Sequence, residues 1–317
     1  MAAGAETPPE GEQIHRDLIG AMSEIYGVHE GRRTVHAKGV WVSGTFTASP
    51  EAAELSSAPQ LSGAEIPALV RFSKASGNPE ANDASRDGGG MAVKLRAGDE
   101  EWDVIGVGPP VFVARTVEDF LELLRLRKPD PETGQPDMEA LGRYLEAHPE
   151  AQLSIQSTLG AEPPASFTSV RYHSPHAFRL VNADGRGTWV RWRWYPPRSE
   201  ERLPDEEARA RGRDYLREDI EERLRGGSAE MELVLQLRGS DDDSLTDPTQ
   251  PWPDSNETLV AGRLVLTEVV DDPEGDGHIE VFDPMRLPSG IEASDDPILH
   301  ARPKAYSVSA YRRLGSG

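Results

Sequence analysis

The sequence predicts an α+β protein whose antiparallel sheet closes into a barrel. Short stretches with a period of two recur along the chain and are divided by clusters of glycine, proline and aspartate, as is typical of strands joined by turns. Between these strands lie stretches with apolar residues at helical spacing. Many antiparallel strands with inserted helices favour an α+β fold, and closing the sheet removes its exposed edges. The 317 residues are enough to build one large core.

The first half of the chain is predicted to be a tail, a helix and then a run of strands. Residues 1–12 are predicted to form a mobile tail. Residues 13–27 are predicted to form a helix, because their apolar side chains recur at helical spacing up to Gly27. From Thr34 the period becomes two, and Thr116 is a suitable N-cap for a helix over residues 116–128. Strands are predicted at residues 34–47, 67–75, 90–98, 101–107 and 110–115.

The second half repeats this alternation of elements. Helices are predicted at residues 137–148, 151–157 and 204–227, and strands at residues 176–182, 187–196, 231–238 and 259–269. In one of these strands Val190, Trp192 and Trp194 alternate with two arginines, which fits a sheet buried on one face.

Composition limits the classes of partner and compartment. The formal net charge of −21 argues against a nucleic-acid partner. No apolar run approaches the roughly 20 residues needed to cross a bilayer, and the N-terminus lacks the basic start and apolar run of a signal peptide. The absence of cysteine excludes disulfides and thiolate ligands and favours a reducing compartment. We therefore expect a cytoplasmic protein without a membrane span.

Several cationic side chains lie in strands that otherwise look buried. His36 falls in the first predicted strand, Arg33 directly precedes that strand, and Arg71 lies between Val70 and Phe72. A solvated strand face is the ordinary explanation for any one of them. An unpaired buried charge is strongly unfavourable, however, and bidentate pairing with a carboxylate is an effective remedy. Several buried arginines together therefore predict an anion in the interior.

Six motifs, in order and at family spacing, match a known family. They read VHAKGVWVSGTF, ALVRFSKASG, GGGMAVKL, WDVIGVGPPVFVART, LPSGIEASDDPIL and RPKAYSVSAYRRLG. Together they resemble the haem catalases, and in particular the short catalase-related peroxidases, from about Gly27 to the C-terminus. The resemblance implies one catalase-like domain over residues 1–317. It also implies a closed antiparallel barrel of about eight strands with inserted and flanking helices, and haem b buried beside that barrel.

The resemblance assigns four residues to the distal side of the haem. His36 matches the distal histidine, and an imidazole that titrates near neutrality can take a proton from a peroxide and return it to the leaving oxygen. Ser73 matches the serine that hydrogen-bonds this histidine and fixes its tautomer. Val35 matches a small residue that packs on the haem face, and Phe120 matches an aromatic residue lining the distal pocket.

On the proximal side the resemblance makes Tyr306 the axial ligand of the haem iron. Arg302 precedes it by one helical turn, and a guanidinium at that spacing would stabilise the phenolate that ferric iron binds. Arg33, Arg71 and Arg313 match the arginines that hold the haem propionates. Those propionates are the anions that the buried arginines require.

One position departs from the pattern of the large catalases. Val107 stands where they carry an asparagine that helps to bind the second peroxide. The loss of this amide disfavours the release of oxygen from hydrogen peroxide and favours organic hydroperoxides. We therefore expect a haem peroxidase that reduces hydrogen peroxide or organic hydroperoxides with a small-molecule electron donor, and that has weak or no catalase activity.

Two alternative functions and one structural question stay open. A fatty-acid hydroperoxide isomerase or dehydratase, like the allene-oxide-forming relatives of this fold, would use His36 and Tyr306 without a donor. A non-catalytic haem binder would require His36 to be displaced or covered. The resemblance is compatible with a homo-oligomer.

Other conspicuous residues are interpreted as structural. His173 and His176 are close in sequence, but no carboxylates or cysteines accompany them as metal ligands. Trp252 is expected to pack in a loop. Gly88–Gly90 is expected to form a tight turn rather than a phosphate cradle, since no helix follows it.

Overall fold

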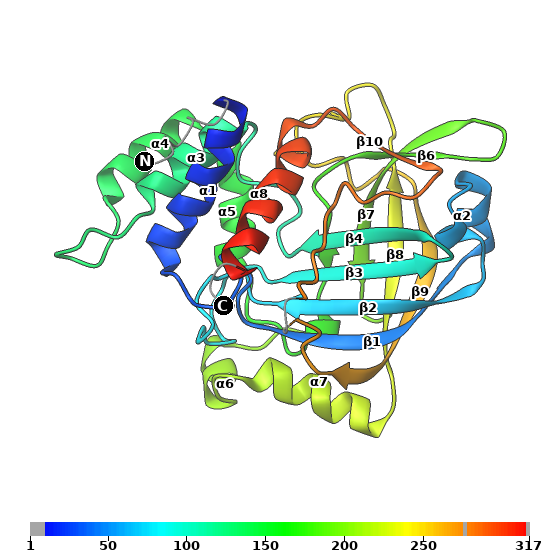
Figure 1. Cartoon of the computed structure of the whole chain (residues 1–317), viewed down its shortest axis with the longest axis horizontal. Helices are drawn as coiled ribbons and strands as arrows, with labels where there is room; N and C mark the ends of the chain where they lie inside the picture. Colours follow the sequence, from blue (N-terminus) through cyan, green and yellow to red (C-terminus); the bar gives the residue numbers. More distant parts are fainter. Residues whose placement is uncertain (1–9, 275–277, 315–317) are drawn as a thin grey trace, which may run out of the picture.

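A closed antiparallel barrel forms the centre of the computed structural model, which describes residues 10–274 and 278–314 (Figure 1). Its strands are β1 (Gly39–Ala48), β2 (Glu65–Ser73), β3 (Gly90–Ala97), β4 (Glu100–Val107), β5 (Tyr172–His173), β7 (Gly187–Tyr195), β8 (Ala229–Leu237) and β9 (Thr258–Val270). They pair in the order β7-β5-β4-β3-β2-β1-β9-β8, and the pairing of β7 with β8 closes the ring. Strands β6 (Phe178–Val181) and β10 (Ile291–Ala293) extend the sheet beyond β7. The predicted barrel of about eight strands is confirmed.

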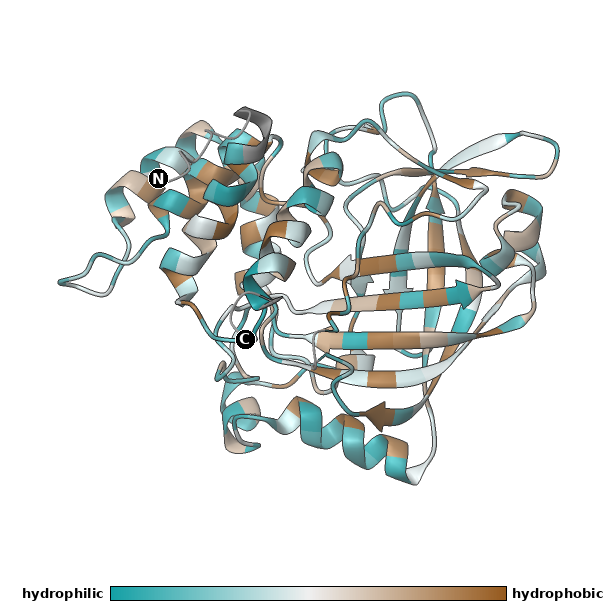
Figure 2. Cartoon of the chain, in the orientation of Figure 1, coloured by the Kyte–Doolittle hydropathy of each residue, from teal (hydrophilic) through white to brown (hydrophobic). Residues whose placement is uncertain are grey.

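Large buried apolar side chains fill the barrel. Hydrophobic and hydrophilic residues follow one another along its strands (Figure 2). Phe46, Trp102 and Trp192 are each at most 1% exposed, and the two indoles meet edge to face at 5.3 Å. One ion pair is buried completely: Lys94 Nζ lies 2.7 Å from Asp103 Oδ1, and both side chains are 0% exposed. Direct pairing is what makes these two buried charges tolerable.

Helices cover the barrel on two sides. They are α1 (Glu10–Tyr26), α2 (Pro50–Leu55), α3 (Val117–Leu126), α4 (Met138–Ala147), α5 (Ala151–Gly160), α6 (Asp205–Ala210), α7 (Tyr215–Gly226) and α8 (Pro297–Leu314), with 3₁₀ turns at Pro59–Leu61 and Phe167–Ser169. Helix α8 lies between the barrel and the group formed by α1 and α3–α5 (Figure 1). Leu18 and Ala21 of α1 pack on Leu121 and Leu124 of α3, which forms a second, smaller core beside the barrel.

Two predicted elements differ in the structure for local reasons. No strand forms at residues 110–115; two prolines, Pro109 and Pro110, interrupt this stretch and cannot donate to a β-ladder. The helix predicted at residues 204–227 is divided into α6 and α7 at Gly212, whose φ of 102° leaves the helical region.

The N-terminal helix begins earlier than expected. Helix α1 starts at Glu10, so residues 10–12 of the predicted tail are helical, whereas residues 1–9 lie outside the described residues. In the part of the chain that the structure describes, no helix combines the length and the apolar character needed to cross a membrane.

Candidate active site

The backbone at His36 is strained. The φ angle of His36 is 56°, and no other non-glycine residue in the described part of the chain has a positive φ. The backbone here is held from both sides, because His36 N donates to Ala75 O at 3.2 Å and Ala37 N donates to Ser76 O at 3.1 Å. Such a conformation costs about 1–3 kcal/mol and tends to persist at functional sites. The prediction that His36 lies within the first strand is wrong, since β1 begins only at Gly39.

Strand register places the partners of His36. Ser73 at the end of β2 pairs with Gly90 at the start of β3, which pairs with Val107 at the end of β4. His36 Nδ1 lies 3.0 Å from Ser73 Oγ, which leaves Nε2 as the nitrogen available to a substrate. A Cβ at Gly90 would lie only 2.9 Å from His36 Cε1, so the imidazole occupies space that only a glycine leaves open. The expected turn at Gly88–Gly90 is present, with positive φ at its first two residues.

His36 and Tyr306 line one cavity. It encloses about 890 Å³ of space free of protein atoms, including the part that opens to solvent. Apolar side chains make much of its wall, among them Val35 and Val107. The other site residues that line it are Arg33, Arg71, Ser73, Arg302 and Arg313. The structure therefore brings together all but one of the residues that the sequence singles out.

Phe120 is the exception, and the structure does not bring it to the cavity wall. Its ring packs edge to face on Phe112 at 4.9 Å, next to the contact between α1 and α3.

A second cavity of about 570 Å³ adjoins the site and is lined by Ser73, Gly88 and Gly89. Ser73 thus forms part of the wall of both cavities.

Burial keeps the imidazole of His36 neutral. The ring keeps some surface toward the cavity, but protein surrounds its other sides, and this desolvation lowers its pKa to about 4. The guanidinium of Arg71 lowers the pKa further, whereas Asp87 opposes the shift. A neutral imidazole can accept a proton, so His36 is poised as a base at pH values well above 4.

Helix α8 supplies the phenol. Arg302 Nη2 and Nε donate to Tyr306 Oη at 2.6 Å and 3.1 Å. The spacing of four residues places the guanidinium and the phenol on one face of the helix, as the sequence predicted.

The start of α8 is held by a buried pair that sequence reasoning missed. Asp296 Oδ1 accepts from the backbone N of Ile298 and Leu299, which caps the helix. Its Oδ2 lies 2.6 Å from His176 Nδ1, and both side chains are 1% exposed. Burial lowers the pKa of His176, against the effect of Asp296. The two residues are 120 positions apart, so no local pattern could have joined them.

The three predicted propionate arginines differ in their partners. Arg33 and Arg313 both bind Glu274, at 2.7 Å and 2.6 Å. Arg71 has one hydrogen bond, from Nη2 to Ala37 O at 3.3 Å, and its Nε has no partner among the described residues. Burial lowers the pKa of Arg71 to about 9, and the positive charge of the nearby Arg33 contributes to this shift. An incompletely paired guanidinium that is 7% exposed is suited to receive an anion.

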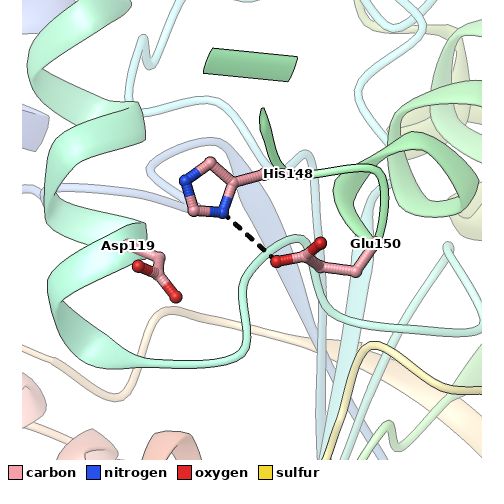
Figure 3. Close-up of side chains that lie close together, drawn as sticks. All are labelled: Asp119, His148 and Glu150. Carbon is pink, nitrogen blue, oxygen red and sulfur yellow. Dashed lines mark hydrogen bonds and ion pairs between the residues drawn. The ribbon is translucent and has the colours of Figure 1, made fainter. Parts of the chain in front are cut away.

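A separate cluster lies on the helical side of the molecule (Figure 3). Asp119 of α3, His148 after α4 and Glu150 before α5 each offer a ligand-type atom within 4.8 Å of the others. His148 Nδ1 already lies 3.2 Å from Glu150 Oε1, and Tyr144 donates to Asp119 O at 2.9 Å. These contacts link α3 to the junction of α4 and α5, so we interpret the cluster as structural. Among the described residues, no group of three or more such side chains includes His173.

With this geometry in place, the family follows from comparison with known proteins. The catalase family model matches residues 28–317, and the chain belongs to the catalase family. It is therefore a haem oxidoreductase that acts on peroxide. A catalase-related peroxidase of Mycolicibacterium paratuberculosis is 37% identical over 94% of this chain and 94% of its own length. A catalase-related peroxidase of Synechococcus elongatus is 31% identical over 93% of this chain and 87% of its own length. A catalase of Pseudomonas syringae is 31% identical across 100% of this chain but only 64% of its own length.

Proposed function

We propose that this chain is a haem b peroxidase that reduces hydrogen peroxide or organic hydroperoxides at the expense of a small-molecule donor, with weak or no release of oxygen. The observation that carries the proposal is the cavity wall, where a neutral imidazole at His36 is combined with an apolar side chain at Val107. Two relatives that match this chain over 94% and 87% of their own length are named catalase-related peroxidases.

The residues around the cavity fit haem. Arg71 keeps an unpaired Nε, and Arg33 and Arg313 already bind a carboxylate, the chemical group of a propionate. Tyr306 offers the phenol oxygen that this family uses as its iron ligand. When bound, haem would supply the redox chemistry that removes the oxygen atom of a peroxide.

The role of the chain is to move a proton at His36 Nε2. Because Ser73 engages Nδ1, the imidazole is held in one orientation with Nε2 free to accept a proton from the peroxide. The same nitrogen can then return that proton to the leaving oxygen. Orientation by Ser73 matters because proton transfer needs hydrogen-bond distance and alignment.

Val107 sets the preference among substrates. Its register partner is Gly90, where a Cβ would meet the imidazole of His36, and Val107 and His36 both line the cavity. A valine cannot donate a hydrogen bond to a second, strongly hydrated peroxide, and it makes the wall more favourable for an alkyl group. The further steps of turnover then require an outside donor.

The alternatives are less well supported. No observation favours a fatty-acid hydroperoxide isomerase, and the relatives are named as peroxidases or catalases. A non-catalytic haem binder is disfavoured because His36 is neither displaced nor covered: it lines the cavity and is bonded to Ser73. We propose neither a particular donor nor an assembly state, although a homo-oligomer is compatible with the proposal.

The test compares oxygen evolution with donor oxidation in the haem-loaded protein. For Val107→Asn we expect oxygen release from hydrogen peroxide to rise by about 10-fold, because a hydrogen-bonding amide returns to the cavity wall; about 1.4 kcal/mol of added stabilisation suffices. Val107→Leu is the matched apolar control and should evolve no more oxygen than the wild type. A wild-type protein that already evolves oxygen faster than it oxidises any donor contradicts the proposal.

A further inference from the structure

Glu274 is bound by Arg33 and Arg313, two of the three arginines predicted to hold the haem propionates. Arg33 Nη1 donates to Glu274 Oε2 at 2.7 Å and Arg33 Nη2 donates to Oε1 at 2.8 Å, while Arg313 Nη1 donates to Oε1 at 2.6 Å. The backbone N of Glu280 adds a fourth hydrogen bond to Oε1 at 3.1 Å. The side chains of Arg33, Arg313 and Glu274 are 15%, 7% and 13% exposed, so this is a largely buried ion-pair cluster.

We propose that Glu274 competes with a haem propionate for Arg33 and Arg313, and that this competition lowers the affinity of the protein for haem. The inference rests on the proposed function, because it needs haem in the cavity. Glutamate and propionate both present a carboxylate on a short alkyl chain, so the same pair of guanidiniums can bind either one.

The donors available to two propionates are unequal. Arg71 has an unpaired Nε, so one propionate can bind there without displacing any side chain. Arg33 has no equivalent freedom: its bidentate face holds Glu274, and its Nη2 also donates to Glu280 O at 2.8 Å. A second propionate that binds the bidentate face of Arg33 therefore has to replace the carboxylate of Glu274.

Glu274 can leave without disturbing the barrel. Its carboxylate contacts only Arg33, Arg313 and the backbone N of Glu280 among the described residues. The chain that follows is held by other groups, because Glu280 pairs with Lys94 at 3.4 Å and the backbone N of Asp283 donates to Asp103 at 2.8 Å. Rotation of one side chain is thus sufficient to expose the arginines.

Competition of this kind has a thermodynamic signature. Glu274 stabilises the protein before haem enters and contributes nothing once it has been displaced, so it reduces haem affinity by the free energy of its own contact. Removing its charge should therefore destabilise the haem-free protein, strengthen haem binding and leave the loaded protein nearly unchanged.

The experiment compares Glu274→Gln with Glu292→Gln. Glu292 pairs with Arg179 at the surface and is 55% exposed, so this control removes the same charge away from the cavity. We expect Glu274→Gln to raise haem affinity by about 10-fold in a Soret titration, a common size for coupled binding. It should also lower the melting temperature of the haem-free protein by at least about 2–4 °C. Glu292→Gln should change neither.

A second probe separates charge competition from general loosening. Haemin dimethyl ester carries no propionate charge, so Glu274→Gln should not bind it better than the wild type does. Equal gains for haemin and its diester would overturn the proposal, as would weaker haem binding by Glu274→Gln. If Glu274→Gln does not fold, Glu274→Asp keeps the charge with a shorter reach, and it should show a smaller gain for haemin only. If the wild type binds haem and oxidises donors, but Glu274→Gln has the same haem affinity as the wild type, this inference alone is refuted. If the wild type binds no haem, the proposed function is refuted as well.

Discussion

The barrel side of the cavity is built by strand register and close packing. Ser73, Gly90 and Val107 are consecutive cross-strand partners on three strands, and His36 is held over them by a strained backbone. The imidazole packs tightly against Gly90, because a Cβ at this position would lie only 2.9 Å from the ring. Position on this side is therefore set by backbone atoms that the whole barrel fixes.

The helix side is built by charged groups that are distant in sequence. One turn of α8 joins Arg302 to Tyr306, but the helix itself is capped by Asp296, which a buried His176 holds in turn. At the other end of α8, Arg313 pairs with Glu274.

The difference teaches which side can adjust to a ligand. Backbone packing has one low-energy arrangement, so the barrel side resists change and suits proton transfer, which needs exact distances within a few tenths of an ångström. Ion pairs can exchange partners with little movement of the backbone. The helix side is therefore suited to admitting and holding a cofactor, and the four predictions below test this division of roles.

The largest effect is expected from removing the imidazole on the barrel side. His36→Ala deletes proton transfer but no cofactor contact, so peroxidase turnover should fall by about 10²–10⁴-fold while haem stays bound. Stopped-flow reaction with peroxide, together with the haem spectrum, measures both quantities. Turnover at the wild-type rate would remove His36 from the mechanism, and Ser73→Ala should give a smaller loss because the base remains.

Removal of the phenol oxygen should act on cofactor binding instead. Tyr306→Phe leaves the ring in place but removes the atom proposed as the iron ligand. Mutation of residues that only hydrogen-bond a metal ligand typically lowers metal affinity or activity by roughly 10–100-fold, so the loss of the ligand itself should lower haem affinity by more than that. Haem titration and the ferric absorption spectrum provide the measurement. Tyr311→Phe is a suitable control, because Tyr311 lies on the same helix and is 73% exposed. An unchanged spectrum in Tyr306→Phe would show that the proximal assignment is wrong.

A single methyl group should disturb the barrel side. Gly90→Ala would place Cβ 2.9 Å from His36 Cε1 and 3.3 Å from Ser73 Oγ, so the imidazole must move. Misplacement of a catalytic group by about 1 Å can cost roughly 100-fold, and we expect a loss of about 10–100-fold in turnover with haem retained. Gly142→Ala in α4 is the control, because a Cβ there meets nothing within 4 Å. Equal activities for the two variants would refute the steric account.

The fourth prediction concerns pH, and its effect is on stability rather than on turnover. The pKa of His36 is lowered from 6.5 to about 4 in the folded protein, mainly by burial, so the unfolded chain binds more protons between these values. The free energy of unfolding should therefore fall as the pH is lowered from about 6.5 to 4, by up to about 3 kcal/mol from this group.

His36→Ala isolates that contribution. His173, whose pKa burial lowers to about 3, and His176 act in the same direction and remain in the variant. Chemical denaturation of the haem-free protein at pH 7 and pH 4.5 should therefore show a smaller loss of stability for His36→Ala than for the wild type. Equal losses would mean that His36 is not protonated on unfolding in this range.

The sequence alone determined the fold class and singled out residues that the structure places around one cavity. Period-two stretches separated by turns predicted the strands, because side chains alternate across a sheet whatever the fold. The Arg302–Tyr306 contact could be predicted because four residues make one helical turn. The family motifs predicted His36 and Ser73, and the structure places them 3.0 Å apart.

Only the tertiary structure decided the contacts that depend on chain segments far apart. The left-handed backbone of His36, the close approach of its ring to Gly90 and the packing of Phe120 on Phe112 arise from how whole elements meet. The partners of His176 and Arg313 likewise come from distant parts of the chain. Long-range pairing is invisible to local pattern, because register and packing are set by the folded barrel and not by the residues next to each group.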